Sequence, residues 1–136
     1  MKLATWTLLA LTAAIAPVED PVDTDFATLS GFDFKEGMTL PKDVSKLNGK
    51  KVKTSGFMTT EDGKDGEVEY FVLVNDACGC EGTPKINEMI FCAMPEGKKV
   101  KIKPGTVWIT GTLSVGEEKE EGVVVSLYTM SIESVN

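Results

Sequence analysis

The residues best suited to chemistry lie in one short segment, residues 76–84. Its sequence is Asp76-Ala77-Cys78-Gly79-Cys80-Glu81-Gly82-Thr83-Pro84. Two thiolates separated by one residue can hold a soft metal ion, and neighbouring carboxylates can complete the ligand set. Because glycine frees the backbone between and after the cysteines, both sulfur atoms can point the same way. We therefore take this segment as the candidate functional site.

Three interpretations of Cys78 and Cys80 follow from their spacing. In the first, the thiolates bind Cu(I) or Zn(II), with Asp76, Glu81 or water completing the coordination of zinc. In the second, they form a strained Cys-x-Cys disulfide, which suits a thiol redox protein because strain raises the reduction potential. In the third, one of them forms a structural disulfide with Cys92 and the other stays free, since the chain has three cysteines.

Residues around the two cysteines are expected to shape the loop. Proline fixes its own backbone and keeps the preceding residue extended, so a Thr-Pro pair would close the segment. Glycines supply the backbone freedom that a tight loop needs. The loop-shaping residues are predicted to be Gly79, Gly82, Pro84 and Asn87.

Cys92 differs from the other two cysteines because it falls within a predicted strand, 88–94. It shares a face of that strand with Ile90 and Met94, and free cysteine is among the most buried residue types. If Val74 lies roughly opposite Glu88 in a hairpin, Cys92 is about 13 Å from the loop, at the usual rise per residue in a strand. We expect Cys92 to pack in the core.

The composition argues against an enzyme. The chain has no histidine, so a cysteine nucleophile would lack the usual base that makes its thiolate, and the nearby Lys85 is better suited to solvent. The acidic run at 117–121 is expected in a solvated turn rather than as an acid/base pair. The prediction is a protein with no catalytic residues.

The charge of the chain excludes another class of partner. The formal net charge is −7, and arginine, the preferred phosphate-binding side chain, is absent. A protein that binds nucleic acid needs clustered cations, so no nucleic-acid partner is expected. One lysine-rich stretch, 98–103, alternates with Val100 and Ile102, which is typical of a half-buried strand with a solvated face.

The N-terminus predicts export. Lys2 precedes an apolar run, and Ala14-Ile15-Ala16 has the small-x-small pattern of a signal-peptidase site. We expect residues 1–16 to be a signal peptide, residues 17–25 a flexible acidic leader, and residues 26–136 the folded domain. The protein would then be periplasmic or extracellular, and it would contact a membrane only if the signal segment stays uncleaved.

The folded part is predicted to be all-β. An irregular segment or short helical turns laid over the core are expected from Phe26 to Leu47, and strands at 51–59, 67–74, 88–94, 106–115 and 123–132. Residues 117–122 form the last turn, and Gly56 marks a bend or bulge in the first strand. Five such strands favour a small OB-like barrel, because closure removes exposed strand edges; a β-sandwich is the alternative.

The order of several short motifs resembles a family of small exported bacterial proteins of unknown function. The resemblance covers residues 40–135, and its specific part is Cys80-Glu81-Gly82-Thr83-Pro84 together with Asn87. Members often have Cys-Cys-Phe-Gly-x-x-Pro at this loop, whereas here Gly79 separates the cysteines. Some members are lipoproteins encoded beside ABC-type transport components for metals, zinc above all. The resemblance implies an OB-like fold, an extracytoplasmic location and no established activity.

Together these observations predict a non-enzymatic exported accessory protein. Its Cys-Gly-Cys loop would bind a soft metal ion, Cu or Zn, or a periplasmic or membrane component of a transport system. A thiol redox protein and a plain interaction module with a structural disulfide are the alternatives.

Overall fold

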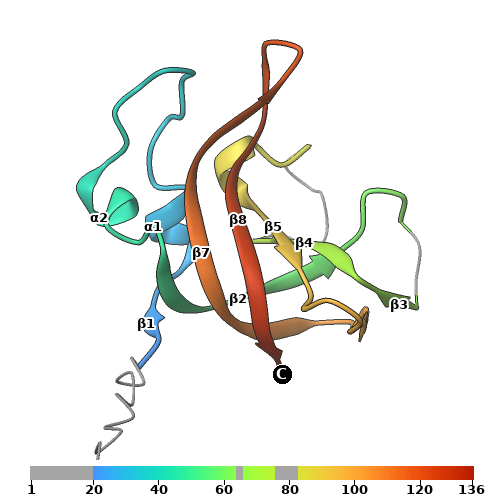
Figure 1. Cartoon of the computed structure of the whole chain (residues 1–136). Coiled ribbons are helices and arrows are strands. Elements are labelled where there is room, and N and C mark those ends of the chain that lie inside the picture. Colours follow the sequence, from blue (N-terminus) through green and yellow to red (C-terminus); the bar gives the residue numbers. More distant parts are fainter. Residues whose placement is uncertain (1–19, 64–65, 76–82) are drawn as a thin grey trace, which may run out of the picture.

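The computed structural model describes residues 20–63, 66–75 and 83–136, and most of these residues form β-strands (Figure 1). The all-β prediction is confirmed. In chain order the elements of these parts are β1 (Val22–Asp23), α1 (Phe26–Leu29), α2 (Lys42–Ser45), β2 (Lys50–Thr59), β3 (Glu67–Val68), β4 (Tyr70–Val74), the 3-10 turn η1 (Ile86–Glu88), β5 (Met89–Ala93), β6 (Val100–Lys101), β7 (Thr106–Glu120) and β8 (Val123–Val135).

The strands of the large sheet pair in a cyclic order. β2 pairs with β4, β4 with β5, β5 with β8, β8 with β7, and β7 again with β2. All of these pairs are antiparallel except β5 with β8, which is parallel. The OB-like barrel itself stays a prediction, which this cyclic pairing supports over two separate facing sheets.

β2 can serve two neighbours because it bends at Gly56. Residues up to Phe57 pair with β7, and residues from Phe57 onward pair with β4. A Cβ atom at position 56 would lie 2.7 Å from the Val74 carbonyl oxygen and 2.9 Å from Cγ of Leu73. Only glycine lets the backbones of β2 and β4 approach this closely. This agrees with the bend or bulge that the sequence predicts at Gly56.

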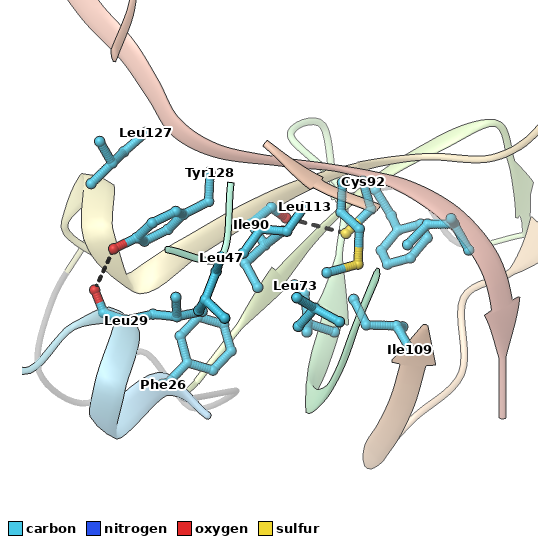
Figure 2. Packing of buried hydrophobic residues seen from close by; sticks show 14 of the residues in the cluster. Phe26, Leu29, Leu47, Leu73, Ile90, Cys92, Ile109, Leu113, Leu127 and Tyr128 are labelled. Atoms are coloured by element: carbon cyan, nitrogen blue, oxygen red, sulfur yellow. Dashed lines mark hydrogen bonds between the residues drawn. The ribbon is translucent and has the colours of Figure 1, made fainter. Parts of the chain in front are cut away.

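The core lies on one face of the paired strands (Figure 2). Alternate residues of β2 are buried, and the same two-residue period holds along β5 and the first part of β7. The apolar interior side chains include Val52, Leu73, Ile90, Ile109, Leu113 and Met130. Because these side chains come from every strand of the ring, the core fixes the register of all of them.

The segment before β2 covers one end of this core. Asp25 caps α1 by accepting a hydrogen bond from the Thr28 amide at 2.9 Å. Phe26 and Leu29 are buried against the strands, as is Val44 of α2. The buried Tyr128 hydroxyl donates to the Leu29 carbonyl at 2.7 Å (Figure 2). The predicted short helical turns are confirmed, and this hydrogen bond joins them to β8.

Ordered pairing begins earlier than the sequence predicts. Val22 and Asp23 form β1, which pairs in parallel with Val52 and Lys53 of β2, whereas the sequence predicts that the folded domain starts at Phe26. Main-chain hydrogen bonds hold β1, including one from the Thr24 amide to the Lys53 carbonyl at 3.0 Å. Such pairing needs no apolar side chain, so hydrophobic patterning gives no signal for it.

The last hairpin is longer than predicted. β7 continues through Glu120, and the turn consists of Glu121 and Gly122, with φ of 52° and 80°. Two consecutive positive φ values are those of a type I′ turn, which suits the twist of a hairpin. The end of this hairpin projects from the rest of the molecule (Figure 1, top). The prediction of a six-residue turn was wrong. Both faces of the projecting part are solvated, so its sequence lacks the alternation of apolar and polar residues that marks a strand.

Contacts with the N-terminal segment brace the projecting hairpin. The Lys119 ammonium lies 2.7 Å from a carboxylate oxygen of Glu36. The Gly37 amide donates to the Glu117 carboxylate at 2.6 Å. These polar contacts are exposed, so each contributes little stability alone, but together they connect the loop before α2 to the hairpin.

The lysine-rich stretch forms the short strand β6, which pairs with β3. Val100 and Ile102 pack against the core, whereas Lys101 and Lys103 are exposed. The interpretation as a half-buried strand with a solvated face is confirmed. No helix within the described residues is long and apolar enough to cross a membrane.

Tyr128→Phe tests how strongly the N-terminal segment is held. Loss of the hydroxyl leaves the buried Leu29 carbonyl without this donor, so we expect the free energy of unfolding to fall by about 1–3 kcal/mol. Urea denaturation followed by circular dichroism measures the change. Tyr70→Phe is the matched control, because Tyr70 is 71% exposed and its hydroxyl is expected to be neutral. If Tyr128→Phe is as stable as the wild type and as Tyr70→Phe, the hydrogen bond from Tyr128 to Leu29 does not stabilise the fold.

Candidate functional site

Most of the predicted site lies outside the described residues. This applies to the predicted metal ligands Asp76, Cys78, Cys80 and Glu81, and to the loop-shaping Gly79 and Gly82. The structure describes both flanks of the segment. β4 ends at Val74, and the chain is described again from Thr83, which precedes η1 and β5. The described residues on either side of the segment therefore provide the structural information about the site.

Asn87 connects this region to the N-terminal segment. Its side chain is 2% exposed, and its amide nitrogen donates to the Phe32 carbonyl at 2.8 Å. The carbonyl can only accept, so the amide oxygen must face the other way, where no described group bonds to it. This hydrogen bond joins residues 55 positions apart, and the loop-shaping role of Asn87 stays a prediction.

Cys92 is a free thiol in the core. Its side chain is 2% exposed and lies on the same face as Ile90, as the sequence predicts. The thiol donates a weak hydrogen bond to the Ile90 carbonyl, with sulfur and oxygen 3.4 Å apart (Figure 2). Burial raises the pKa of the Cys92 thiol, because the thiolate would lose its hydration. This cysteine is therefore a protonated packing residue at neutral pH.

A cleft lies where the segment joins the sheet; we call it the loop-side cleft. Thr83 and Pro84 line it together with Phe57, Val72, Val74 and Met89, and its volume is about 510 Å³. Phe57, Val74 and Met89 are direct neighbours across β2, β4 and β5, so they occupy one row on the outer face of the sheet. The cleft is mostly apolar, and a thioether lies within it.

A second pocket, which we call the aromatic pocket, lies over β4, β5 and β8. Its volume is about 570 Å³, and its outward-facing lining includes Tyr70, Val72, Phe91, Ala93, Thr129 and Ser131. Glu61 and Glu118 also line it. Sequence reasoning missed this pocket because its residues come from separate segments. The available signal was the apolar character of both faces of residues 68–74.

The two pockets share two lining residues, Glu61 and Val72. They therefore adjoin on one face of the molecule. Among the described residues, no three cysteine or acidic side chains lie close enough to hold a metal ion. What these pockets offer chemically is apolar contact, aromatic ring faces, the thioethers of Met58, Met89 and Met130, and a few carboxylates.

Comparison with known proteins finds one matching family model and a similar crystal structure. The family model described as "Protein of unknown function (DUF3299)" matches residues 16–136. The crystal structure of a DUF3299 family protein from Pseudomonas aeruginosa PAO1 is similar, with a TM-score of 0.57 and 20% sequence identity over 86% of this chain and 95% of that one. At this identity the likeness shows the fold alone. No curated protein matches the chain.

The burial of Cys92 predicts its reactivity. In a Cys78→Ser/Cys80→Ser variant, a thiol reagent should label nothing in the folded protein and one thiol per chain after denaturation. The reason is that a buried thiol with a raised pKa is neither accessible nor ionised. A colorimetric thiol assay with and without guanidinium measures this. Rapid labelling of the folded variant would show that Cys92 is accessible.

The raised pKa of Cys92 also predicts a loss of stability at alkaline pH. The folded state keeps the proton while the unfolded thiol ionises near its usual pKa of about 8.5. The contribution of the Cys92 thiol to the free energy of unfolding is therefore complete below about pH 8.5. It is lost as the pH rises toward the folded pKa, by up to about 1.4 kcal/mol per pH unit. Urea denaturation between pH 8 and pH 10 should show a shallower decline for Cys92→Ala than for the wild type. Parallel declines would contradict the prediction.

Proposed function

For this chain, which belongs to the DUF3299 family, we propose a role as a non-enzymatic, exported accessory protein that binds a soft metal ion through Cys78 and Cys80. The partner to which such an ion passes would be a periplasmic or membrane component of a transport system. The proposal rests on the chemistry of two thiols in one short segment and on the described residues beside it.

The observation that carries the proposal is the position of Met89. Met89 pairs with Val74, the last residue of β4, and lines the same cleft as Thr83 and Pro84. Thr83 and Pro84, the first residues described after the segment, therefore line a cleft that also contains a thioether. A thioether is a neutral, soft ligand, and together with thiolates it favours Cu(I).

Met89 also favours Cu(I) over Zn(II) within this proposal. Zinc prefers thiolate, imidazole or carboxylate ligands and usually takes four of them. The chain has no histidine, and the thioether lies among apolar side chains, including Val74 and Pro84. An apolar surrounding suits a singly charged ion bound by a few soft ligands better than a doubly charged ion.

Competition with a coloured Cu(I) chelator under anaerobic, reducing conditions tests the proposal. We expect the wild type to bind one Cu(I) per chain and Cys78→Ser/Cys80→Ser to lose this binding. Met89→Leu should weaken Cu(I) binding about tenfold, which corresponds to about 1.4 kcal/mol, because leucine keeps the volume and removes the sulfur.

Met94→Leu is the matched control, since Met94 follows the other end of β5 and packs against the core. It should bind Cu(I) as the wild type does. Retention of full Cu(I) binding by the double serine variant would overturn the proposal. A reversible Cys78–Cys80 disulfide without metal binding would instead support the thiol redox alternative.

A further inference from the structure

The outer face of β4 and β5 has no polar side chain at its outward positions. The two strands pair as Tyr70 with Ala93, Val72 with Phe91, and Val74 with Met89. The alternate residues, such as Leu73 and Ile90, belong to the core cluster, so these three pairs face outward. A sheet with one solvated face normally alternates apolar and polar residues. These two strands are apolar on both faces.

The neighbouring strands keep the usual pattern. The outward residues of β2 before its bend are Lys51, Lys53 and Ser55, and β7 places Thr110 and Thr112 outward. On β7 Trp108 is an isolated apolar residue among polar outward positions, whereas under the aromatic pocket and the loop-side cleft the outward residues of β4 and β5 are apolar in succession. Tyr70, at the rim, is 71% exposed. Val72 and Val74 are buried, so the accessible apolar surface here consists mainly of Tyr70 and the half-buried Phe91 beside an open pocket, an arrangement suited to binding.

The charged residues of the aromatic pocket are all acidic. Glu61 follows β2, and Glu118 lies on the β7–β8 hairpin, where the Ser126 hydroxyl donates to its carboxylate at 3.1 Å. No lysine is among the described lining residues. Two carboxylates at an apolar pocket with two aromatic rings favour a cation, because ring faces and carboxylates both attract positive charge.

The shape of the combined surface favours a polypeptide over a small amine. The aromatic pocket reaches β8, the loop-side cleft reaches β2, and both share Glu61 and Val72 above β4. Neighbouring strands are about 4.8 Å apart, so a ligand crossing from β8 to β2 spans about 14 Å, which an extended peptide covers with about four residues. A second copy of this chain is disfavoured as the occupant by the net charge of −7.

We propose that the outer face of β4, β5 and β8 binds an extended segment of a partner protein in which lysine or arginine alternates with aliphatic residues. The aliphatic side chains pack on Phe91 and Ala93, and the cationic groups lie over Tyr70 and beside Glu61 and Glu118. The proposal uses neither Cys78 nor Cys80, so we expect the segment to bind without a metal ion at these residues.

Selection from a random twelve-residue peptide display library, with the full protein as target, tests the proposal. We expect enrichment of peptides with lysine or arginine next to leucine, isoleucine or valine. A selected peptide, synthesised with a fluorescent label, should bind the wild type. Its affinity for Glu61→Gln/Glu118→Gln and for Tyr70→Ala should be at least tenfold lower. Fluorescence polarisation at two salt concentrations should show weaker salt dependence for the double variant.

Matched controls separate this surface from general charge and from the cysteines. Glu120→Gln lies on the same hairpin but does not line the pocket, and Trp108→Ala removes another exposed aromatic residue, on β7. Both should bind the peptide as the wild type does, and so should Cys78→Ser/Cys80→Ser. Circular dichroism confirms that each variant folds.

Several results would overturn the proposal. They are the absence of any enriched peptide, enrichment of acidic peptides, and undiminished binding by Glu61→Gln/Glu118→Gln. Two others identify a different occupant. Butylamine or choline competing at the same molar concentration as the peptide would identify a small organic cation, and dimerisation of the wild type that Tyr70→Ala abolishes would identify a second copy of this chain.

Discussion

The structure depends on one constraint, the close approach of β2 and β4 at Gly56. β2 must pair with β7 over most of its length and then turn toward β4. The approach places the position of a missing Cβ atom 2.7 Å from the Val74 carbonyl oxygen. Any larger residue would push β4 away and open the ring of pairings. Since Val74 is also the residue at which β4 ends and the loop-side cleft begins, the bend positions the candidate site as well as the core.

Much of the fold followed from the sequence because most strands have one buried face. The two-residue alternation around Val52, Ile90 and Ile109 predicted β2 and β5 close to their observed bounds, and the start of β7. β1 gave no such signal, because it is held through its backbone. The projecting end of β7–β8 gave none either, because Glu-Lys-Glu-Glu is equally suited to a turn and to a ribbon solvated on both sides. The alternation of apolar and polar residues indicates which face of a strand is buried, so it gives no signal for strands that bury neither face.

The candidate site was predictable only in its chemistry. The thiols, glycines and proline of one short segment identify it in the sequence. By contrast, Met89 beside the segment and the Asn87 bond to Phe32 depend on which segments the fold brings together. The aromatic pocket is the extreme case, since Glu61, Phe91 and Glu118 belong to different elements. No spacing within the chain indicates that they meet.

Stability explains the buried Val72 and Val74, but it does not explain the exposed Tyr70 and the half-buried Phe91 on the outer face of β4 and β5. Their inward neighbours, such as Leu73 and Cys92, already supply the core contacts that these strands need. Threonine or lysine at the outward positions would keep β propensity and favourable hydration, as threonine does on β7. Phe91 and Tyr70 instead leave apolar surface beside open pockets, which increases the risk of aggregation. A feature that contributes little to the fold and adds this risk is better explained by binding than by folding.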